Sequence, residues 1–214
     1  MKNIFLCATE YETENIFDKR KLKVSESFPY KTYSINTENM IILTGVGKAN
    51  SAAATQYLLK YNPKHIFNLG LAGSLDNTHP IGKTFIVSSC RNWDTDATSF
   101  GYKFGQIPVN GLETYCLNAR ITDLDLPSVS LISGDSFITD SSMIRKNLEL
   151  YNPTLLDMEL VSIAHVLHVN NSLDKLVSVK AISDYINKDS TKDFYSKKFD
   201  VFKDLREIPL RLMI

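Results

Sequence analysis

The stretch that decides the fold is NPKHIFNLGLAGS at residues 62–74, where an apolar segment follows a helix-stopping Asn-Pro pair and runs into small residues. His65 to Leu69 is a short, nearly continuous apolar run without polar alternation. Such runs are typical of strands that are covered on both faces, as in a sheet between two layers of helices. The stretch therefore predicts an α/β fold.

Similar runs recur along the chain, at Ile4–Ala8, Met40–Leu43, Thr84–Val87, Val129–Ile132 and Leu176–Ile182. Helical spacing of apolar residues lies between them, at Ala49–Tyr61, Ser141–Tyr151 and Leu160–Val169. A last helix is expected from about Ser190 to before Pro209, with one apolar face made of Phe194, Phe199, Phe202 and Leu205.

Lys31–Asn36 and Met40–Leu43 flank a polar turn and predict an antiparallel hairpin ahead of the first crossover helix. The sheet is therefore expected to be mixed, mostly parallel and twisted, with helices on its faces. No repeat or flexible linker divides the sequence, so we predict one domain over residues 1–214.

Charge and cysteine content narrow the classes of partner. The 214 residues carry 24 Lys plus Arg and 24 Asp plus Glu, a balance that argues against nucleic acid or an anionic membrane as a partner. Cys7, Cys90 and Cys116 lack the spacing of a disulfide framework or a zinc site. We expect a cytoplasmic protein without a membrane span, metal or organic cofactor.

Two glycine-bearing segments follow apolar runs. Thr44–Lys48 opens a helix, where free backbone N–H groups and the Lys48 ammonium could meet an anion, although it is not a Walker motif. Gly70–Gly73 is expected to be a turn whose small residues, Ala72 and Gly73 among them, let a flat ligand approach the backbone. A tight turn without a ligand is the alternative for both.

Acidic residues stand at the ends of three predicted strands. Glu12 follows the first, Asp157 to Glu159 ends a strand from Thr154, and Asp184 closes the strand over 177–182. Ligands of open α/β sheets collect at the carboxyl ends of strands, so these acids could form one carboxylate site. Carboxylates perform acid–base chemistry or hold sugar hydroxyls, whereas a lone acid there is usually a helix cap.

Two further features have weaker implications. His165 and His168 are three residues apart on a helix, but no third ligand has matching spacing, so we expect a packing or surface role. The irregular segment from Arg91 to Asp125 is long for a compact domain and rich in aromatic residues, which favours a pocket or a subunit contact.

Together these segments resemble the purine nucleoside phosphorylase superfamily, and most closely its 5′-methylthioadenosine/S-adenosylhomocysteine nucleosidases. The resemblance covers nearly the whole chain in the family's order. The matching stretches are ATEYE (8–12), TGVGK (44–48), NLGLAG (68–73), DTDATSFGYKFGQIP (94–108), SGDSFI (133–138), DME (157–159) and AISD (181–184).

The resemblance implies a phosphorylase/hydrolase-like fold, usually a homodimer, that cleaves the N-glycosidic bond of a small adenine nucleoside with water. By position, Asp184 would protonate or hydrogen-bond N7 of the leaving purine, with Ser183 beside it. Glu12 would be the base that activates the water. Glu159 would hold the ribose hydroxyls, with Met158 against the sugar.

The other binding residues follow from the same resemblance. Phe137 would stack on the base and the backbone of Ile138 would read its edge. The 5′-substituent pocket would be lined by Val46 and, from the neighbouring subunit, by Phe100, Tyr102 and Pro108. The segment between Pro108 and Ser133 looks shortened, with a surface helix reduced to Leu112–Leu117.

Three alternatives remain open at this level. A phosphorylase is disfavoured because Asn68 and Leu71 stand where such relatives carry a phosphate-binding Arg and Ser. Hydrolysis of futalosine-type nucleosides would release a different base. A nucleoside-binding protein without turnover would have no need of both a proton donor and a water base.

Overall fold

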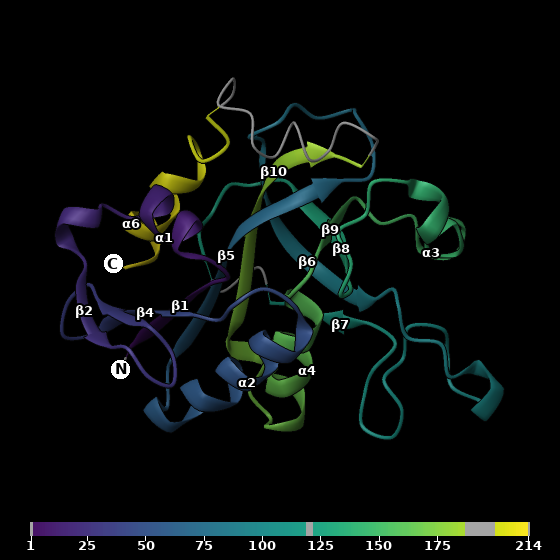
Figure 1. Cartoon of the computed structure of the whole chain (residues 1–214), viewed down its shortest axis with the longest axis horizontal. Coiled ribbons are helices and arrows are strands. Elements are labelled where there is room, and N and C mark those ends of the chain that lie inside the picture. The colour runs from purple at the N-terminus through teal and green to yellow at the C-terminus, as the bar shows by residue number, and fades with distance from the viewer. Residues whose placement is uncertain (1, 119–121, 187–199, 214) are drawn as a thin grey trace.

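The computed structural model describes residues 2–118, 122–186 and 200–213 (Figure 1). Its strands belong to one ten-stranded sheet. They are β1 (Asn3–Cys7), β2 (Lys23–Glu26), β3 (Thr32–Ser34), β4 (Asn39–Leu43), β5 (His65–Ser74), β6 (Thr84–Asn92), β7 (Tyr115–Cys116), β8 (Ser128–Ser133), β9 (Leu155–Asp157) and β10 (Leu176–Tyr185). The α-helices are α1 (Glu10–Ile16), α2 (Lys48–Leu58), α3 (Arg145–Tyr151), α4 (Leu160–Val169) and α6 (Ile208–Leu212).

Five strands of the sheet close into a ring. β5 pairs with β10, β10 with β6, β6 with β8, β8 with β9, and β9 again with β5. β1 pairs in parallel with β5 and leads through β4 to the antiparallel strands β3 and β2. The predicted mixed sheet and the hairpin that ends in β4 are confirmed, while the ring was not foreseen.

Helices cover both faces of the sheet. Alternate residues of β1 enter different cores: Ile4 packs with α2 and α4, and Phe5 packs with α1 and α6. Because side chains of a strand alternate between faces, a run that is apolar at every position needs this double cover. α2 and α4 lie side by side below the ring in Figure 1, and the chain ends lie together near β1.

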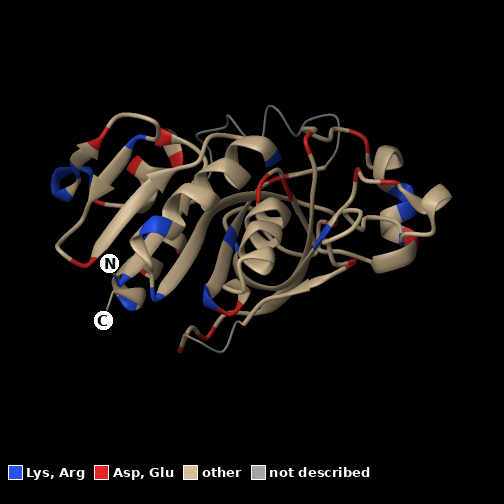
Figure 2. Cartoon of the chain, turned by 90° about the horizontal axis from the view of Figure 1, so that it is seen from below, with Lys and Arg blue, Asp and Glu red and all other residues tan. Residues whose placement is uncertain are grey.

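The predicted helices agree closely with the observed ones. α2 runs over Lys48–Leu58 and tightens into a 3₁₀ turn at Leu59–Tyr61, and α4 has the predicted bounds. Ser141–Tyr151 is a 3₁₀ turn capped by the side chain of Asp140 and then α3. Positions of Lys and Arg and positions of Asp and Glu are both spread along the ribbon in Figure 2.

Three predictions about local structure are wrong. Gly70–Gly73 is not a turn, because β5 continues through it to Ser74. Leu112–Leu117 is not a helix but contains β7, since its Tyr115 is buried under α4. Pro209 does not end the last helix but stands in the first turn of α6, where a missing N–H is tolerated.

The rest of the predicted last helix, including Phe194 and Phe199, lies outside the described residues. Its remaining apolar positions, Phe202 and Leu205, are buried as expected. Within the described ranges, no helix has the length and apolar character needed to cross a bilayer.

Candidate active site

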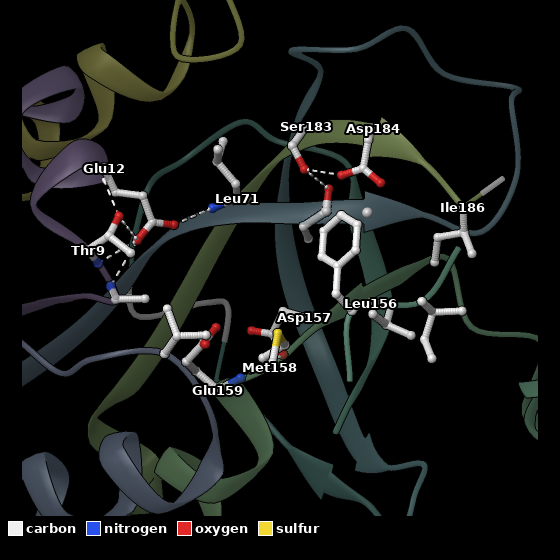
Figure 3. A pocket seen from close by; sticks show the side chains of 16 residues that line it. Thr9, Glu12, Leu71, Leu156, Asp157, Met158, Glu159, Ser183, Asp184 and Ile186 are labelled. Carbon is white, nitrogen blue, oxygen red and sulfur yellow. Dashed lines mark hydrogen bonds between the residues drawn. The ribbon is translucent and has the colours of Figure 1, made fainter. Parts of the chain in front are cut away.

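A cavity of about 250 Å³ lies beyond the carboxyl ends of β1, β5, β9 and β10. The carboxyl groups of Glu12, Glu159 and Asp184 reach it from three directions (Figure 3). Ten of the predicted site residues line it, and the complete lining is Ala8, Thr9, Glu12, Val46, Leu71, Ala72, Gly73, Phe137, Ile138, Leu156, Asp157, Met158, Glu159, Ser183, Asp184 and Ile186.

A second cavity, of about 470 Å³, lies at the opposite ends of β1 and β5. It is lined by Lys2, Lys64 and Arg211 and by none of the three acids. Of these two cavities, the first is therefore the one lined by the three acids that the sequence predicts.

Glu12, in the first turn of α1, is held by backbone N–H groups from the loop between β1 and α1 and from β5. Its Oε2 accepts hydrogen bonds from the backbone N–H groups of Ala8 at 2.9 Å and Thr9 at 3.0 Å, and Oε1 accepts one from Leu71 at 3.0 Å. Thr9 in turn caps α1 by accepting from the Glu12 N–H, which makes a capping box. The fold thus fixes this carboxylate, 8% exposed, at the cavity wall.

Gly70 explains why this arrangement fits. A Cβ at that position would lie 2.5 Å from Glu12 Oε1 and 3.6 Å from Lys180 Nζ. Only a residue without a side chain leaves room for the carboxylate and the ammonium against the strand.

Glu159 stands at the junction of β9 and α4. Its Oε1 accepts a 2.9 Å hydrogen bond from the backbone N–H of Gly47. Burial and the neighbouring Asp157 carboxylate raise the pKa of Glu159 from 4.5 to about 7, against the opposing effects of Lys180 and of that N–H group. Glu159 therefore changes charge near neutral pH.

Lys180 is a buried charged residue that the sequence did not predict, and it lies beside three acids of the site. Its Nζ lies 2.9 Å from Asp157 Oδ2, and the two side chains are 2% and 1% exposed. Burial alone would lower the pKa of Lys180, but the carboxylates of Asp157, Glu159 and Glu12 outweigh it and raise that pKa. The feature of the sequence that could have indicated Lys180 is its charge inside the apolar run over 176–182.

Asp157 also organises the start of α4. Its Oδ1 accepts a hydrogen bond from Ser133 Oγ at 2.6 Å, and both of its oxygens accept from the backbone N–H of Leu160, at 3.3 and 3.2 Å. This aspartate accepts the first backbone N–H of α4 and pairs with Lys180, so it both lines and supports the site.

A β-bulge presents Asp184. The register of β10 against β5 shifts between Ile182 and Asp184, so Ser183 is the extra residue. Such bulges re-aim side chains beside active sites. Ser183 Oγ lies 2.6 Å from Asp184 Oδ1 and 3.2 Å from the carbonyl oxygen of Ala72. The hydroxyl can donate to the aspartate, or accept from its protonated form while donating to Ala72.

The turn before α2 is not free to bind an external anion. The backbone N–H of Gly47 donates to Glu159, and that of Lys48 donates to Asp135 Oδ1 at 2.7 Å. The Lys48 ammonium pairs with Asp94. Carboxylates of the chain itself thus occupy the positions where the sequence allowed a ligand.

The remaining cavity wall is largely apolar. Leu71, Leu156 and Ile186 line it, and Phe137, 48% exposed, stands at its mouth. Phe100, Tyr102 and Pro108 do not line this cavity, and Phe100 is 83% exposed. That placement leaves them available to a neighbouring molecule.

The two histidines have packing roles. His165 Nδ1 lies 2.9 Å from the hydroxyl of buried Tyr115, and both His165 and His168 contact its ring edge-on. Among the residues that the structure describes, no group of His, Cys, Asp and Glu is arranged to hold a metal ion.

Comparisons with known proteins identify the family. The family model of the phosphorylase superfamily matches residues 2–206. A 5′-methylthioadenosine/S-adenosylhomocysteine nucleosidase from Desulfotalea psychrophila is 33% identical over 183 residues, which cover 80% of this chain and 77% of that protein.

Solved structures share the fold. The nucleosidase of that name from Neisseria meningitidis, in complex with methylthio-immucillin-A, matches with a TM-score of 0.83 at 21% identity over 100% of this chain and 99% of that one. A futalosine hydrolase from Helicobacter pylori has the same TM-score at 17% identity, covering 100% and 96%. Fold similarity alone does not separate these activities, whereas the relative that is 33% identical in sequence shows the family. The chain therefore belongs to the phosphorylase superfamily and, within it, to the 5′-methylthioadenosine/S-adenosylhomocysteine nucleosidases.

Proposed function

We propose that this protein hydrolyses the N-glycosidic bond of 5′-methylthioadenosine, S-adenosylhomocysteine or a close 5′-substituted adenosine and releases adenine. The observation that carries the proposal is the arrangement of Glu12, Glu159 and Asp184 around one largely apolar cavity. Loss of the purine leaves a sugar with oxocarbenium character, which nearby carboxylates stabilise.

Each acid has a distinct part in the reaction. Glu12 accepts a proton from the water as its oxygen bonds to C1′ of the sugar. The electron pair of the glycosidic bond moves to the purine, and Asp184 supplies a proton to N7 so that the base leaves neutral. Glu159 accepts hydrogen bonds from the ribose hydroxyls, and Met158 packs against the sugar. Acid–base assistance of this kind is worth about 100- to 10,000-fold per group.

Several features support these roles. Three backbone N–H groups fix the Glu12 carboxylate, which leaves further lone pairs to orient water. Ser183 can hydrogen-bond Asp184 in either protonation state. Phe137 and Ile138 at the cavity wall offer an aromatic face and a backbone edge to the base.

Water is favoured over phosphate as the nucleophile. No Lys or Arg is among the described residues that line the cavity, and the side chain at the position of a phosphate-binding serine is Leu71. Asn68 is buried and its Oδ1 accepts a 3.1 Å hydrogen bond from Ser178, away from the cavity. A phosphate dianion would enter an acidic, apolar pocket without a counter-ion.

A homodimer is the proposed assembly. Phe100 and Val109 are 83% and 80% exposed, and Val109 has a φ of 72°, which costs energy for a β-branched residue. Apolar Val46 and Phe137 are half exposed at the cavity mouth. A second copy that places its Phe100 segment over this mouth would cover both surfaces and complete the 5′-substituent pocket.

A cytoplasmic location is also part of the proposal. The free cysteines agree with it, because disulfides are rare in that compartment.

The deciding experiment is a product assay on purified protein. Methylthioadenosine, S-adenosylhomocysteine, adenosine, inosine and futalosine are incubated with and without phosphate, and free bases are measured by chromatography. We expect adenine from the first two compounds, independent of phosphate. Base release only with phosphate would indicate a phosphorylase, and hypoxanthine from futalosine alone would indicate the other hydrolase.

The variant Asp184→Asn separates turnover from binding. It should release adenine at least 100-fold more slowly while still binding a substrate analogue. Binding by the wild type without any base release would favour a nucleoside-binding protein instead.

A further inference from the structure

Three residues outside the cavity form a closed ring of contacts. The Lys48 ammonium pairs with Asp94 Oδ1, Asp94 Oδ2 accepts a 2.9 Å hydrogen bond from the Asp135 backbone N–H, and Asp135 Oδ1 accepts one of 2.7 Å from the Lys48 backbone N–H. Asn92 adds a 3.3 Å contact from its Oδ1 to the same ammonium. None of these residues lines the cavity.

The ring joins three segments that are distant in the chain. Lys48 begins α2, Asp94 follows β6, and Asp135 follows β8. Two of these segments lead directly to the site: Gly47 precedes Lys48 and donates to Glu159, and Phe137 comes two residues after Asp135.

Gly47 is the point where the ring meets the site. Its N–H donates to Glu159 on the cavity side, and a Cβ on Gly47 would lie 3.0 Å from Asp135 Oδ1 on the other side. Its φ of 93° is one that residues with side chains rarely adopt. Because glycine constrains its own backbone less than other residues do, the position of this turn depends on the contacts that Lys48 and Asp135 make.

We propose that the Lys48–Asp94–Asp135 ring positions the Gly47 N–H against Glu159 and so sets the geometry of the sugar-binding carboxylate. This proposal rests on the proposed function for its effect on turnover but not for its effect on Glu159. These are positioning residues, since they act on substrate only through Glu159.

The charge environment gives the ring a measurable signature. Glu159 is faced by Asp157 from β9, Lys180 from β10, Glu12 from α1 and the Gly47 N–H from the turn before α2. A hydrogen bond to the charged form lowers a pKa. If the ring is broken and the Gly47 N–H moves away, the pKa of Glu159 should rise further and its ionisation should need higher pH.

The test compares Lys48→Met and Asp135→Ala, which break the ring at different contacts. Lys48→Arg keeps the charge and serves as the conservative variant. Lys146→Met is the matched control. Lys146 pairs with Asp96, which lies in the same segment as Asp94, but both of these side chains are about half exposed. The side chains of Lys48 and Asp94 are each 22% exposed. Methylthioadenosine cleavage and thermal unfolding are measured from pH 5 to 9.

We expect Lys48→Met and Asp135→Ala to lower kcat/KM about 10- to 100-fold and to move its acidic limb to higher pH by about one unit. Lys48→Arg should recover most of the activity, and Lys146→Met should stay within about twofold. In thermal unfolding, the loss of stability between pH 5 and pH 8 should be larger in the two ring variants than in the wild type.

Adding Glu159→Gln should remove that difference in pH dependence. A wild type that releases no adenine would contradict the proposed function, yet the unfolding profiles would still test the ring. Ring variants with the wild-type pH dependence of unfolding would overturn the inference. The inference would also be overturned if the loss of activity in the ring variants equalled the fraction of protein that is unfolded.

Discussion

Replacing Glu159 by glutamine should stabilise the protein near neutral pH while it abolishes function. The raised pKa of Glu159, about 7 against 4.5 for a free carboxyl, means that the folded state resists ionising this group. At about 1.4 kcal/mol per pH unit, the folded protein loses about 3 kcal/mol of stability between pH 4.5 and pH 7 from this residue. The sign follows from the raised pKa: the contribution is complete below pH 4.5 and is lost as the pH rises through 7.

Glutamine keeps the acceptor for the Gly47 N–H but carries no charge, so Glu159→Gln should avoid that loss. At pH 8 we expect a gain of about 3 kcal/mol, which raises Tm by about 6–12 °C for a chain of this size. At pH 5 the gain should fall below about 1 kcal/mol. Thermal or denaturant unfolding at both pH values measures the difference.

Glu12→Gln is the matched comparison because its expected sign is opposite. Three backbone N–H groups donate to the two Glu12 oxygens, and a glutamine amide nitrogen would face at least one of them. One buried donor is then left without an acceptor, which costs about 1–3 kcal/mol. The raised pKa of Glu159 would be refuted if Glu159→Gln changed the free energy of unfolding equally at pH 5 and pH 8. It would also be refuted if this variant destabilised the protein as Glu12→Gln does.

Three further variants test the wall of the site. Gly70→Ala should lower kcat about 100-fold, because its Cβ would lie 2.5 Å from Glu12 Oε1 and displace that carboxylate, with steady-state kinetics as the measurement. Lys180→Met should destabilise the protein by about 3–5 kcal/mol in denaturant unfolding, because it leaves buried carboxylates uncompensated. Ser183→Ala should slow turnover about tenfold or more and shift the pH profile of kcat, because Asp184 loses its hydrogen-bond partner at 2.6 Å. An unchanged pH profile would show that Ser183 does not assist Asp184 in the reaction.

The sequence indicated the sheet and the meeting of the acids because those features depend on local pattern. Apolar runs indicate burial on both faces. Glu12 follows β1 and Asp184 lies near the end of β10, and both strands run parallel to β5, so their carboxyl ends share an edge. Glu159 reaches the same place by a different route. β9 runs antiparallel to β5. The end of β9 reaches the cavity because the five strands β5, β10, β6, β8 and β9 close into a ring.

Features that depend on contacts between distant segments could not be read from the pattern. Lys180 lies in an apolar run, and its counter-ion Asp157 comes from another strand. The segment over 112–117 has no strand alternation, and β7 forms there because buried Tyr115 packs beneath α4. Both outcomes follow from tertiary packing, which overrides local propensity.

Burying several carboxylates together costs folding free energy, and the same carboxylates can stabilise the cationic sugar of the reaction. Glu12, Asp157 and Glu159 lie around the buried ammonium of Lys180, so in the described part of the chain this cluster has fewer positive than negative groups. Burial first, and then the carboxylates of Asp157 and Glu12, raise the pKa of Glu159, so a negative charge on Glu159 is unfavourable in the folded protein. A sugar that becomes cationic as the purine departs supplies the missing positive charge only at the transition state. The unfavourable interaction is therefore relieved selectively there, which is the differential binding that lowers a reaction barrier.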